Sequence, residues 1–278
     1  AMLASCAAAG PGADFTHFYR QQRVVPAAEF PRLLDALATP LPLVLRVSPR
    51  APLAEKARHR LSSLLEKDLL EERELLWAGG RVWQYRVNTT VRRDRGAGEQ
   101  DYHRFLQRQQ SRGALQRQES VSMIPALVLS PQRHHGVLDM CAAPGSKTCQ
   151  LLEMMEAAEG GEGQGFVVAN DASLARAISL NHRLQSTNVA SPLTLVTSVD
   201  ARWWPSLRGL AFDRILCDVP CSGDGTLRKR HANTPPWDVG VALALHETQV
   251  RLLRQVRQAV VPRGGCATYG EVGLLFSG

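Results

Sequence analysis

The sequence predicts an α/β fold in which a parallel sheet, wound with helices, follows a smaller α+β module. Short apolar runs alternate with amphipathic segments from residue 136 onward, whereas the first half has a different and more basic pattern. Hydrophobic residues make up 44% of the 278 residues and charged residues 21%, which is enough apolar material for a buried core. We divide the chain into a poorly ordered N-terminus at 1–14, an α+β module at 15–115 and a larger domain at 116–278.

The expected elements of the N-terminal module alternate between helix and strand. In chain order they are helical turns over 19–37, a short buried strand over 41–47, an amphipathic helix over 54–70 and a half-exposed strand over 83–87. This β-α-β order indicates a small α+β unit. Residues 92–98 are charged and contain glycine, which favours a loop, and the Gln- and Arg-rich residues 107–118 favour a surface helix or a connector.

The larger domain begins a regular series of strands and helices. Strands are expected over 136–141, 165–171, 193–197, 212–218 and 266–269. Helices are expected from the segment after Gly145 to Met155, over 174–185 and over 241–261. Strands that alternate with helices in this way are typical of a parallel sheet.

An aspartate ends or follows each of the first four strands of this series. These residues are Asp139, Asp171, Asp200 and Asp218. Each of them alone is compatible with a turn or a capping residue. Together they favour a ligand site, because open α/β sheets bind ligands at the carboxyl ends of their strands, and an acid after the second strand commonly binds a ribose. We therefore expect an adenosine-type ligand.

Two other nucleotide-binding motifs are disfavoured by the order of the residues. A P-loop requires glycine directly before its lysine, but Ser146 separates Gly145 from Lys147. The glycine-rich residues 160–165 precede a strand, whereas the dinucleotide fingerprint follows one. An adenosyl ligand without a pyrophosphate fits better than either.

Positive charge is concentrated in the N-terminal half. The net charge is +7, and residues 1–130 carry 19 Lys or Arg against 13 Asp or Glu. Arginine binds phosphate and stacks on bases, so this half is compatible with a nucleic-acid interface. The alternative is a solvated surface in a chain that prefers arginine to lysine. The arginines of the densest stretch are Arg81, Arg86, Arg92, Arg93, Arg95, Arg104, Arg108, Arg112 and Arg117.

Several classes of protein are excluded by composition. The six cysteines are too few for a disulfide scaffold and include no Cys-x-x-Cys pair, so we expect reduced thiols and no metal site. Every apolar run is shorter than the ~18 residues that cross a bilayer, and we expect no membrane association. The apolar start at 1–9 lacks a basic residue, which argues against a signal peptide. Because the chain begins with Ala1, we expect it to be a fragment.

Three segments carry a resemblance to a known family. They are Asp139–Thr148 (DMCAAPGSKT), Asp218–Thr226 (DVPCSGDGT) and Arg117–Pro125 (RQESVSMIP). With these segments the chain resembles the RsmB/Nop/Sun-type RNA cytosine-C5 methyltransferases, and in particular their eukaryotic tRNA-modifying subgroup, over about residues 15–270. The resemblance implies a Rossmann-like class I methyltransferase sheet, without its last strands, preceded by a small α+β RNA-binding module.

The resemblance also implies ligands and the residues that bind them. S-adenosylmethionine would be the methyl donor, and RNA, above all tRNA, the substrate of a monomeric protein in the nucleus or nucleolus rather than in the cytoplasm. Asp171 would bind the ribose of the donor, Asp200 would lie at its adenine, and Asp218 would face both the donor and the target cytosine. The loop beneath the donor would consist of Cys141, Ala142, Ala143, Pro144, Gly145, Ser146 and Lys147.

The implied catalytic residues are incomplete in this sequence. Besides Asp218 and Lys147, the resemblance assigns product release to Cys221 and places the nucleophilic cysteine in a Thr-Cys pair after the fifth strand. Val272 occupies the position of that cysteine, and Cys266 lies six residues too early. We therefore expect a chain that is truncated after its fifth strand and inactive by itself. The alternative is a pseudoenzyme that binds RNA, S-adenosylmethionine or both.

Overall fold

The computed structural model describes most of the chain in two units. The described residues are 13–39, 41–48, 51, 53–66, 69–78, 81–87, 96–158, 165–186, 193–203, 212–224, 228 and 237–259. One unit comprises Pro42–Asp218 and the end of the last described helix from Leu252. The other comprises the residues up to Leu41 together with Val219–Arg251.

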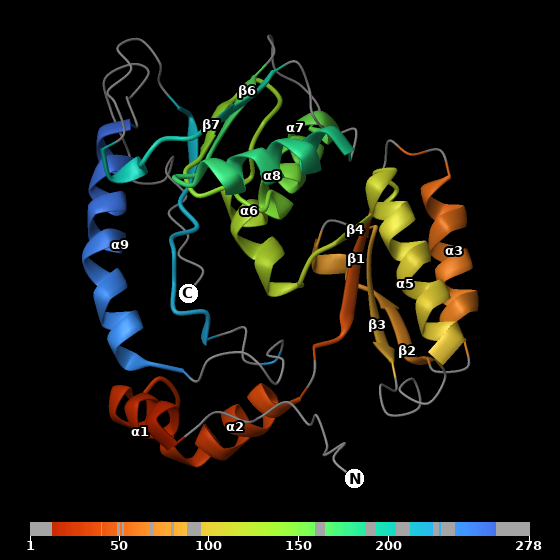
Figure 1. Ribbon diagram of the computed structural model, residues 1–278, viewed down its shortest axis with the longest axis horizontal. Coiled ribbons are helices and arrows are strands. Elements are labelled where there is room, and N and C mark those ends of the chain that lie inside the picture. The colour runs from red at the N-terminus through yellow and green to blue at the C-terminus, as the bar shows by residue number, and fades with distance from the viewer. Residues whose placement is uncertain are drawn as a thin grey trace. The chain divides into compact units, whose positions relative to one another are not determined.

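An antiparallel four-stranded sheet forms the first part of the larger unit, in the order β2-β3-β1-β4. β1 pairs with β3 on one side and with β4 on the other. Two helices, α3 and α5, stand side by side against this sheet (Figure 1). The elements are β1 (Leu43–Val47), α3 (Ala54–Leu65), β2 (Leu69–Glu74), the 3-10 turn η2 (Leu76–Ala78), β3 (Val82–Val87), α5 (Gly96–Ser111) and β4 (Leu115–Arg117).

Strand β1 is buried on both of its faces. Successive side chains of a strand point to opposite faces. Leu45 therefore packs with Leu61 of α3 in one buried cluster, while Val44 packs with Met123 in another. Arg46, on the same face as Val44, is 5% exposed. A charged residue thus lies inside a fully buried strand.

The strands predicted over 41–47 and 83–87 are confirmed as β1 and β3, but the β-α-β prediction for this module is wrong in three places. The helix expected over 54–70 ends at Leu65, and β2 follows it. The segment expected to be a helix or connector contains β4, and α5 begins at Gly96, inside an expected loop. The acid-rich sequence of β2 is unlike that of a typical strand. It becomes one by pairing with β3, where Glu71 lies opposite Arg86 and forms an ion pair of 3.3 Å with it.

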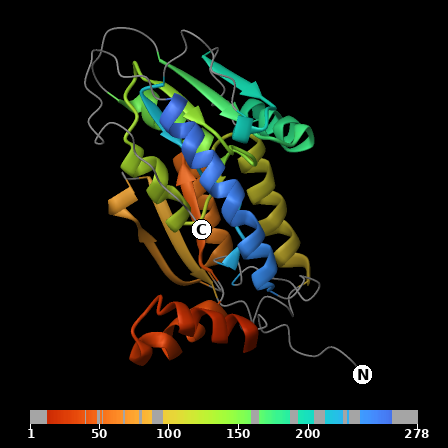
Figure 2. The same ribbon diagram turned by 90° about the vertical axis from the view of Figure 1, so that its left-hand side faces the viewer.

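A parallel four-stranded sheet forms the second part of the larger unit, in the order β7-β6-β5-β8. Figure 2 shows it, in green and cyan, as a layer separate from the orange antiparallel sheet. Its strands are β5 (Gly136–Asp139), β6 (Phe166–Asn170), β7 (Thr194–Thr197) and β8 (Arg214–Leu216). The helical elements around it are η3 (Val121–Met123), α6 (Ile124–Leu129), α7 (Ser146–Ala157), α8 (Leu174–Ser186) and η4 (Ala201–Trp203).

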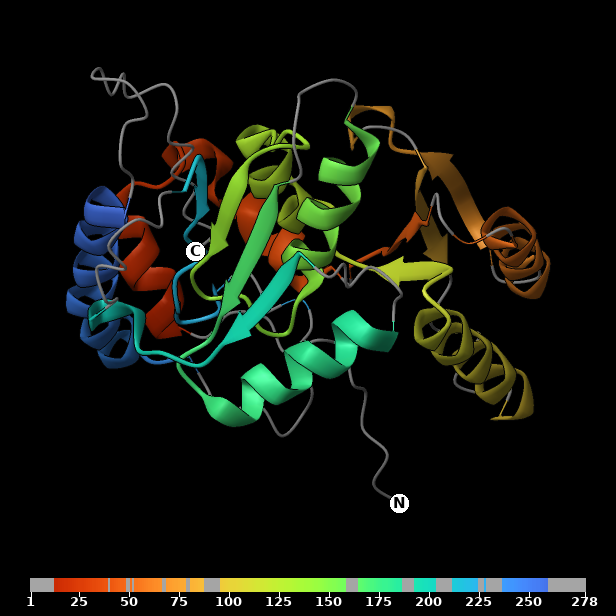
Figure 3. The same cartoon turned by 90° about the horizontal axis from the view of Figure 1, so that it is seen from above.

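Helices α6, α7 and α8 lie around the parallel sheet (Figure 3). Their apolar side chains share one buried cluster with it. Val137 of β5 and Val167 of β6 enter it from the sheet, Leu151 from α7 and Leu180 from α8. The four strands expected before residue 220, and the two helices between the first three of them, are confirmed. The apolar runs of β5, β6 and β8 were recognisable because strands inside a parallel sheet are buried on both faces, whereas β7, at the edge of the described sheet, is only partly buried.

The smaller unit is organised around a cluster of aromatic rings. The ring of Trp237 lies 5.4 Å from that of Phe15, measured between centroids, and Tyr19 lies beside both. Asp224 accepts hydrogen bonds from the Tyr19 hydroxyl and from Trp237 Nε1. The described elements of this unit are α1 (Ala13–Gln22), η1 (Ala27–Glu29), α2 (Phe30–Ala38) and the first part of α9 (Val239–Ala259).

Some predictions fall on residues outside the described ranges. These are the N-terminus at 1–12, the loop residues 92–95 and the fifth strand at 266–269. The division expected at residues 115–116 stays a prediction. No helix among the described residues combines the length and apolar character that crossing a membrane requires.

Candidate active site

Four aspartates lie at the carboxyl ends of the parallel strands. Asp139 is the last residue of β5, and Asp171, Asp200 and Asp218 follow β6, β7 and β8. Because the strands are parallel, these ends share one edge of the sheet. β5 and β8 are neighbours although β6 and β7 lie between them in the sequence. Asp139 and Asp218 therefore flank the point where the strand order reverses, which is where open α/β sheets bind ligands.

Lys147 joins the first turn of α7 to the end of β8. Its Nζ lies 2.6 Å from Oδ2 of Asp218, and the two side chains are 13% and 24% exposed. A charge-assisted hydrogen bond this short fixes the direction of both groups. The pair therefore holds the Asp218 carboxylate in place next to the loop that precedes α7.

Asp139 lies buried next to this ion pair and is 1% exposed. Its Oδ2 accepts a hydrogen bond of 2.8 Å from the hydroxyl of Thr148. Burial, together with the charge of Asp218, raises the pKa of Asp139 to about 7, against the opposing effects of Thr148 and Lys147. Asp139 is therefore a group that takes up and releases a proton near neutral pH.

The loop between β5 and α7 is built from small residues. Ala142 and Ala143 are 6% and 7% exposed, so the backbone of the loop has little side chain around it. Gly145 has a φ of +97°, and a Cβ at this position would lie 2.6 Å from Cδ1 of Leu180. Glycine is therefore required there. Because α7 begins at the next residue, its first N–H groups adjoin the loop, as in sites that bind anionic groups.

Arg176 connects Asp171 to this loop by contacting both. Its Oδ1 accepts a hydrogen bond of 3.0 Å from the N–H of Ser173, and its Oδ2 lies 3.3 Å from Arg176. Arg176 also donates a 2.6 Å hydrogen bond to the carbonyl oxygen of Ala143. The sequence analysis missed Arg176. A basic residue in the first turn of a helix opposes the helix dipole, and this is a signal that it has an acidic partner.

Asn170 connects three strand ends and was also missed. Its Nδ2 donates to the carbonyl oxygens of Met140 and Val199 at 3.1 and 2.9 Å. Its Oδ1 accepts from the Thr197 hydroxyl and the Val199 N–H, both at 2.9 Å. The side chain is fully buried and uses all its hydrogen-bonding groups. Asn170 thus fixes the segments that follow β5 and β7 relative to the end of β6.

Asp200 is engaged by its own neighbour. Arg202 Nη2 lies 2.6 Å from its Oδ2, and the N–H of Arg202 donates to its Oδ1 at 3.0 Å. The Arg202 guanidinium accordingly lowers the pKa of Asp200, whose side chain is 37% exposed. The structure places Asp200 at the expected edge, but the interactions that link Asp139, Lys147 and Asp218 do not include it.

The described cysteines differ sharply in their surroundings. Burial, and then the negative groups around them, raise the pKa of Cys141, and raise that of Cys217 to about 12. Both therefore stay protonated at neutral pH, which makes them poor nucleophiles. Cys221 is exposed and belongs to the smaller unit, three residues after Asp218. Cys266 and Val272 lie outside the described residues.

The residues at this edge fit an adenosyl ligand. A carboxylate has about four acceptor positions, so each oxygen of Asp171 accommodates a second hydrogen bond, such as one from a ribose hydroxyl. Arg176, which covers Asp171, is 58% exposed and lies at the surface. The small-residue loop and the start of α7 add room and N–H donors. Within the described ranges, no group of three or more His, Cys, Asp or Glu residues is arranged to hold a metal ion.

Comparison with known proteins identifies relatives of this chain. The family model described as 16S rRNA methyltransferase RsmB/F matches residues 126–273. The multisite-specific tRNA:(cytosine-C(5))-methyltransferase of Saccharomyces cerevisiae is 38% identical over 260 residues, which is 86% of this chain and 37% of the yeast protein. The tRNA (cytosine(34)-C(5))-methyltransferase of Drosophila melanogaster is 43% identical over 183 residues, 62% of this chain and 24% of the fly protein. The chain spans well under half of either relative.

Solved structures share the fold. A methyltransferase homolog protein from Pyrococcus horikoshii superposes with a TM-score of 0.63 at 24% identity, over 89% of this chain and 70% of the other. NSun6 from the same organism, determined with SFG, gives a TM-score of 0.62 at 16% identity, over 94% of this chain and 85% of the other. The likeness at such low identity confirms a Rossmann-like methyltransferase fold. The family model, which begins inside α6 and covers more than half of the sequence, shows that the chain belongs to the RsmB/F methyltransferase family.

Proposed function

We propose that this chain carries the donor site and part of the catalytic site of an S-adenosylmethionine-dependent RNA (cytosine-C5) methyltransferase. The Lys147–Asp218 ion pair, next to the small-residue loop, is the observation that carries the proposal. Relatives named for methylation of cytosine C5 in tRNA support it. Substrate and activity belong to the proposal, since the chain spans only part of those relatives.

S-adenosylmethionine, when bound, supplies the methyl group. We assign its ribose hydroxyls to Asp171, which Arg176 and Ser173 hold in place. The loop from Cys141 to Gly145, with Ser146 and Lys147, lines the donor: the small side chains of the loop leave room, and the first N–H groups of α7 provide backbone donors. Asp200 contributes at the adenine through the segment that Asn170 holds after β7.

The target cytosine is assigned to the end of β8. An ionised carboxylate accepts hydrogen bonds, so Asp218 would bind the amino group of the base. Lys147 keeps that carboxylate oriented. Asp139, whose pKa burial raises to about 7, would hold a proton beneath the pair. The base must leave its stack to reach this edge, as in other enzymes that modify bases.

Two cysteine positions decide whether the chain can complete methyl transfer to cytosine. Carbon C5 of cytosine is a weak nucleophile, and addition of a thiolate to C6 makes it reactive. After methyl transfer, loss of the C5 proton allows the thiolate to leave. We assign Cys221, an exposed thiol, to product release. Val272 replaces the expected nucleophile, so this chain is proposed to bind its substrates without completing the reaction.

RNA binding is assigned to the antiparallel sheet and α5. Arg104, Arg108 and Arg112 recur every four residues along α5 and its end, and all three are exposed. Arg86 and Arg117 are exposed on β3 and β4, which flank β1. The guanidinium groups along α5 form a cationic surface suited to phosphates. A tRNA substrate and a nuclear location remain part of the proposal.

Donor binding and methyl transfer test the proposal together. We expect the chain to bind S-adenosylmethionine in calorimetry and to transfer no labelled methyl group to unmodified tRNA. Lys147→Met should weaken the ordering of Asp218 without unfolding the chain. Failure of the folded chain to bind the donor would overturn the function. Formation of 5-methylcytosine that disappears in Cys221→Ala would overturn the assignment of Cys221 to release.

A pseudoenzyme is the second candidate, and Val272 is the observation that favours it. The double variant Glu271→Thr/Val272→Cys distinguishes the two candidates. Methyl transfer by this variant supports an enzyme site that lacks only its nucleophile. Retained binding of tRNA and donor without any transfer favours a binding protein.

A further inference from the structure

Helix α7 presents a polar stripe to the antiparallel sheet. Ser146, Gln150 and Glu153 are spaced i, i+4 and i+7, which places them on one side of the helix. Gln150 is 4% exposed, and the side chain of Glu153 is 12% exposed. Polar groups buried to this degree are stable only with hydrogen-bonding partners.

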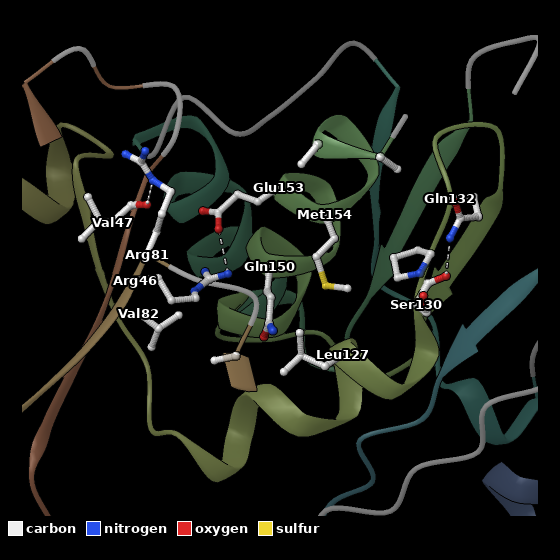
Figure 4. Close-up of a pocket in the computed structure, with 14 residues that line it drawn as sticks. Arg46, Val47, Arg81, Val82, Leu127, Ser130, Gln132, Gln150, Glu153 and Met154 are labelled. Carbon is white, nitrogen blue, oxygen red and sulfur yellow. Dashed lines mark hydrogen bonds and ion pairs between the residues drawn. The ribbon is translucent and has the colours of Figure 1, made fainter. Parts of the chain in front are cut away.

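The partners come from the antiparallel sheet. Arg46 of β1 donates from Nη1 to Oε2 of Glu153 at 2.9 Å and from Nη2 to the carbonyl oxygen of Ser146 at 3.4 Å. Gln118, directly after β4, donates to Oε1 of Gln150 at 2.9 Å. We call Arg46, Gln118, Ser146, Gln150 and Glu153 the polar seam. Figure 4 shows Arg46 and Glu153 pointing toward each other, with Gln150 beside them.

Apolar packing does not close the space beside the seam. A cavity of about 460 Å³ opens there, and Val82, Leu127 and Met154 lie along its walls (Figure 4). Apolar contacts tolerate shifts of one surface along another, whereas a buried ion pair is stable only in a narrow geometry. The side chains of Arg46 and Glu153 are 6% and 12% exposed. The seam therefore sets the orientation of α7 on the sheet.

The seam acts at the end of α7 where the donor loop begins. Ser146, which Arg46 contacts, directly follows Gly145 of the loop and directly precedes Lys147. We propose that Arg46 is a positioning residue through which the antiparallel sheet orders the donor loop and Lys147. The role of the loop rests on the proposed function, but its order is measurable without any ligand. The proposal therefore makes the N-terminal sheet part of the donor site as well as an RNA surface.

Variants of the seam must separate positioning from stability. Arg46→Met leaves the Glu153 carboxylate buried without its charge partner, which strongly destabilises a protein. The double variant Arg46→Met/Glu153→Met replaces both partners by apolar side chains of similar size, so its melting temperature should stay near that of the wild type. The matched control is Arg86→Met, which removes the same charge from an exposed ion pair of the same sheet.

Amide hydrogen exchange of the full 278-residue chain, without ligand, is the test. The amides to follow are Ala142, Gly145 and Cys149, which donate to Asn170, Ala142 and Gly145. In the double variant we expect exchange at these amides to accelerate about tenfold or more, with exchange in β6 unchanged. Arg86→Met should change neither. Donor affinity of the double variant should fall by a similar factor.

Two outcomes would overturn the proposal. One is unchanged exchange at the loop amides in the folded double variant. The other is an equal acceleration throughout the loop and β6, which means general destabilisation instead of positioning. A wild-type chain that binds no S-adenosylmethionine would contradict the proposed function, yet the exchange data would still decide the role of Arg46.

Discussion

Within the described residues, the two sheets of the larger unit have four strands each but differ in where their strands end. In the antiparallel sheet, neighbouring strands end at opposite edges, so the residues that follow them are divided between two edges. In the parallel sheet all carboxyl ends share one edge, where four aspartates lie. Lys147 and Asp218 meet there although they are 71 residues apart in the sequence. Strand direction, more than sequence proximity, concentrates the chemical groups.

A pair of buried amides makes this difference measurable. Asn170 of the parallel sheet uses every hydrogen-bonding group of its side chain, and Gln116 of the antiparallel sheet is 1% exposed. Among the residues that the structure describes, Nε2 of Gln116 has no hydrogen-bond partner. The same functional group therefore orders strand ends in one sheet and fills space in the other.

The largest expected effect is on stability. Asn170→Ala should lower the free energy of unfolding by about 3–5 kcal/mol, because it leaves one buried and three partly buried polar groups without their partner. Gln116→Leu should change it by no more than about 1 kcal/mol, since it removes an unsatisfied amide. Equilibrium unfolding in urea measures both. Equal losses in the two variants would contradict the comparison.

The free energy of unfolding should depend on pH through Asp139, at the edge of the sheet where the four aspartates lie. Asp139 has a pKa raised from the ordinary 3.8 to about 7 by burial. The folded state therefore binds a proton that the unfolded state releases, and the stabilising contribution is complete below pH 4 and is lost as the pH rises through 7. At higher pH, wild type should have lost roughly 4 kcal/mol relative to Asp139→Asn.

Urea unfolding at pH 5 and pH 8 tests this expectation. The difference between wild type and Asp139→Asn should change with pH, whereas Asp35→Asn, which alters an exposed acid in α2, should give a constant difference. Parallel curves for all three proteins would show that Asp139 is ionised in the folded state.

Two aspartates of this edge should differ in how much they contribute to the affinity for S-adenosylmethionine. Asp171→Ala should weaken binding of S-adenosylmethionine by about ten- to a hundredfold, because charge-assisted hydrogen bonds are worth roughly 1.5–3 kcal/mol. Asp200→Ala should have a smaller effect, since Arg202 already pairs with that carboxylate. Calorimetry on folded variants gives both values. Unchanged affinity in Asp171→Ala would remove this residue from the site.

The smallest effect is expected for tRNA binding by the arginines of α5, which packs on the antiparallel sheet. Replacing Arg104, Arg108 and Arg112 by Gln should lower tRNA affinity and flatten the log–log salt slope by about 0.7–0.9 for each phosphate that an arginine no longer neutralises. The control replaces three other exposed arginines by Gln and so removes the same charge. These are Arg20, Arg23 and Arg32. An equal change of slope in both variants would indicate net charge instead of a binding surface on α5.

The two sheets also differ in how far sequence predicts them. β5, β6 and β8 are recognisable because strands buried on both faces form apolar runs, and β7, which is partly exposed, is recognisable because it follows a regular helix. The loop with Gly145 and the four acids could be placed from the same pattern. β2 could not, because its acidic residues become a strand only through pairing with β3, where Glu71 meets Arg86.

Residues that act through distant partners were beyond prediction. Asn170 was passed over because its partners follow two other strands. Arg46 and Glu153 are 107 residues apart, and nothing local indicates that a buried strand would use an arginine to reach a helix of the next sheet. Such contacts depend on the tertiary arrangement, whereas composition and periodicity report only on local structure.

The order β7-β6-β5-β8 has a consequence for how the protein folds. β6 and β7 add to β5 one after the other, but β8 must return to the opposite side of β5, where the N–H of Gly136 donates to Asp213 across 77 residues. Closing such a long loop is entropically unfavourable and slow, so we expect this pairing to form late. During synthesis, the loop before α7 would then be shaped before Asp218 arrives to meet Lys147. The Lys147–Asp218 ion pair would therefore form only when β8 pairs with β5.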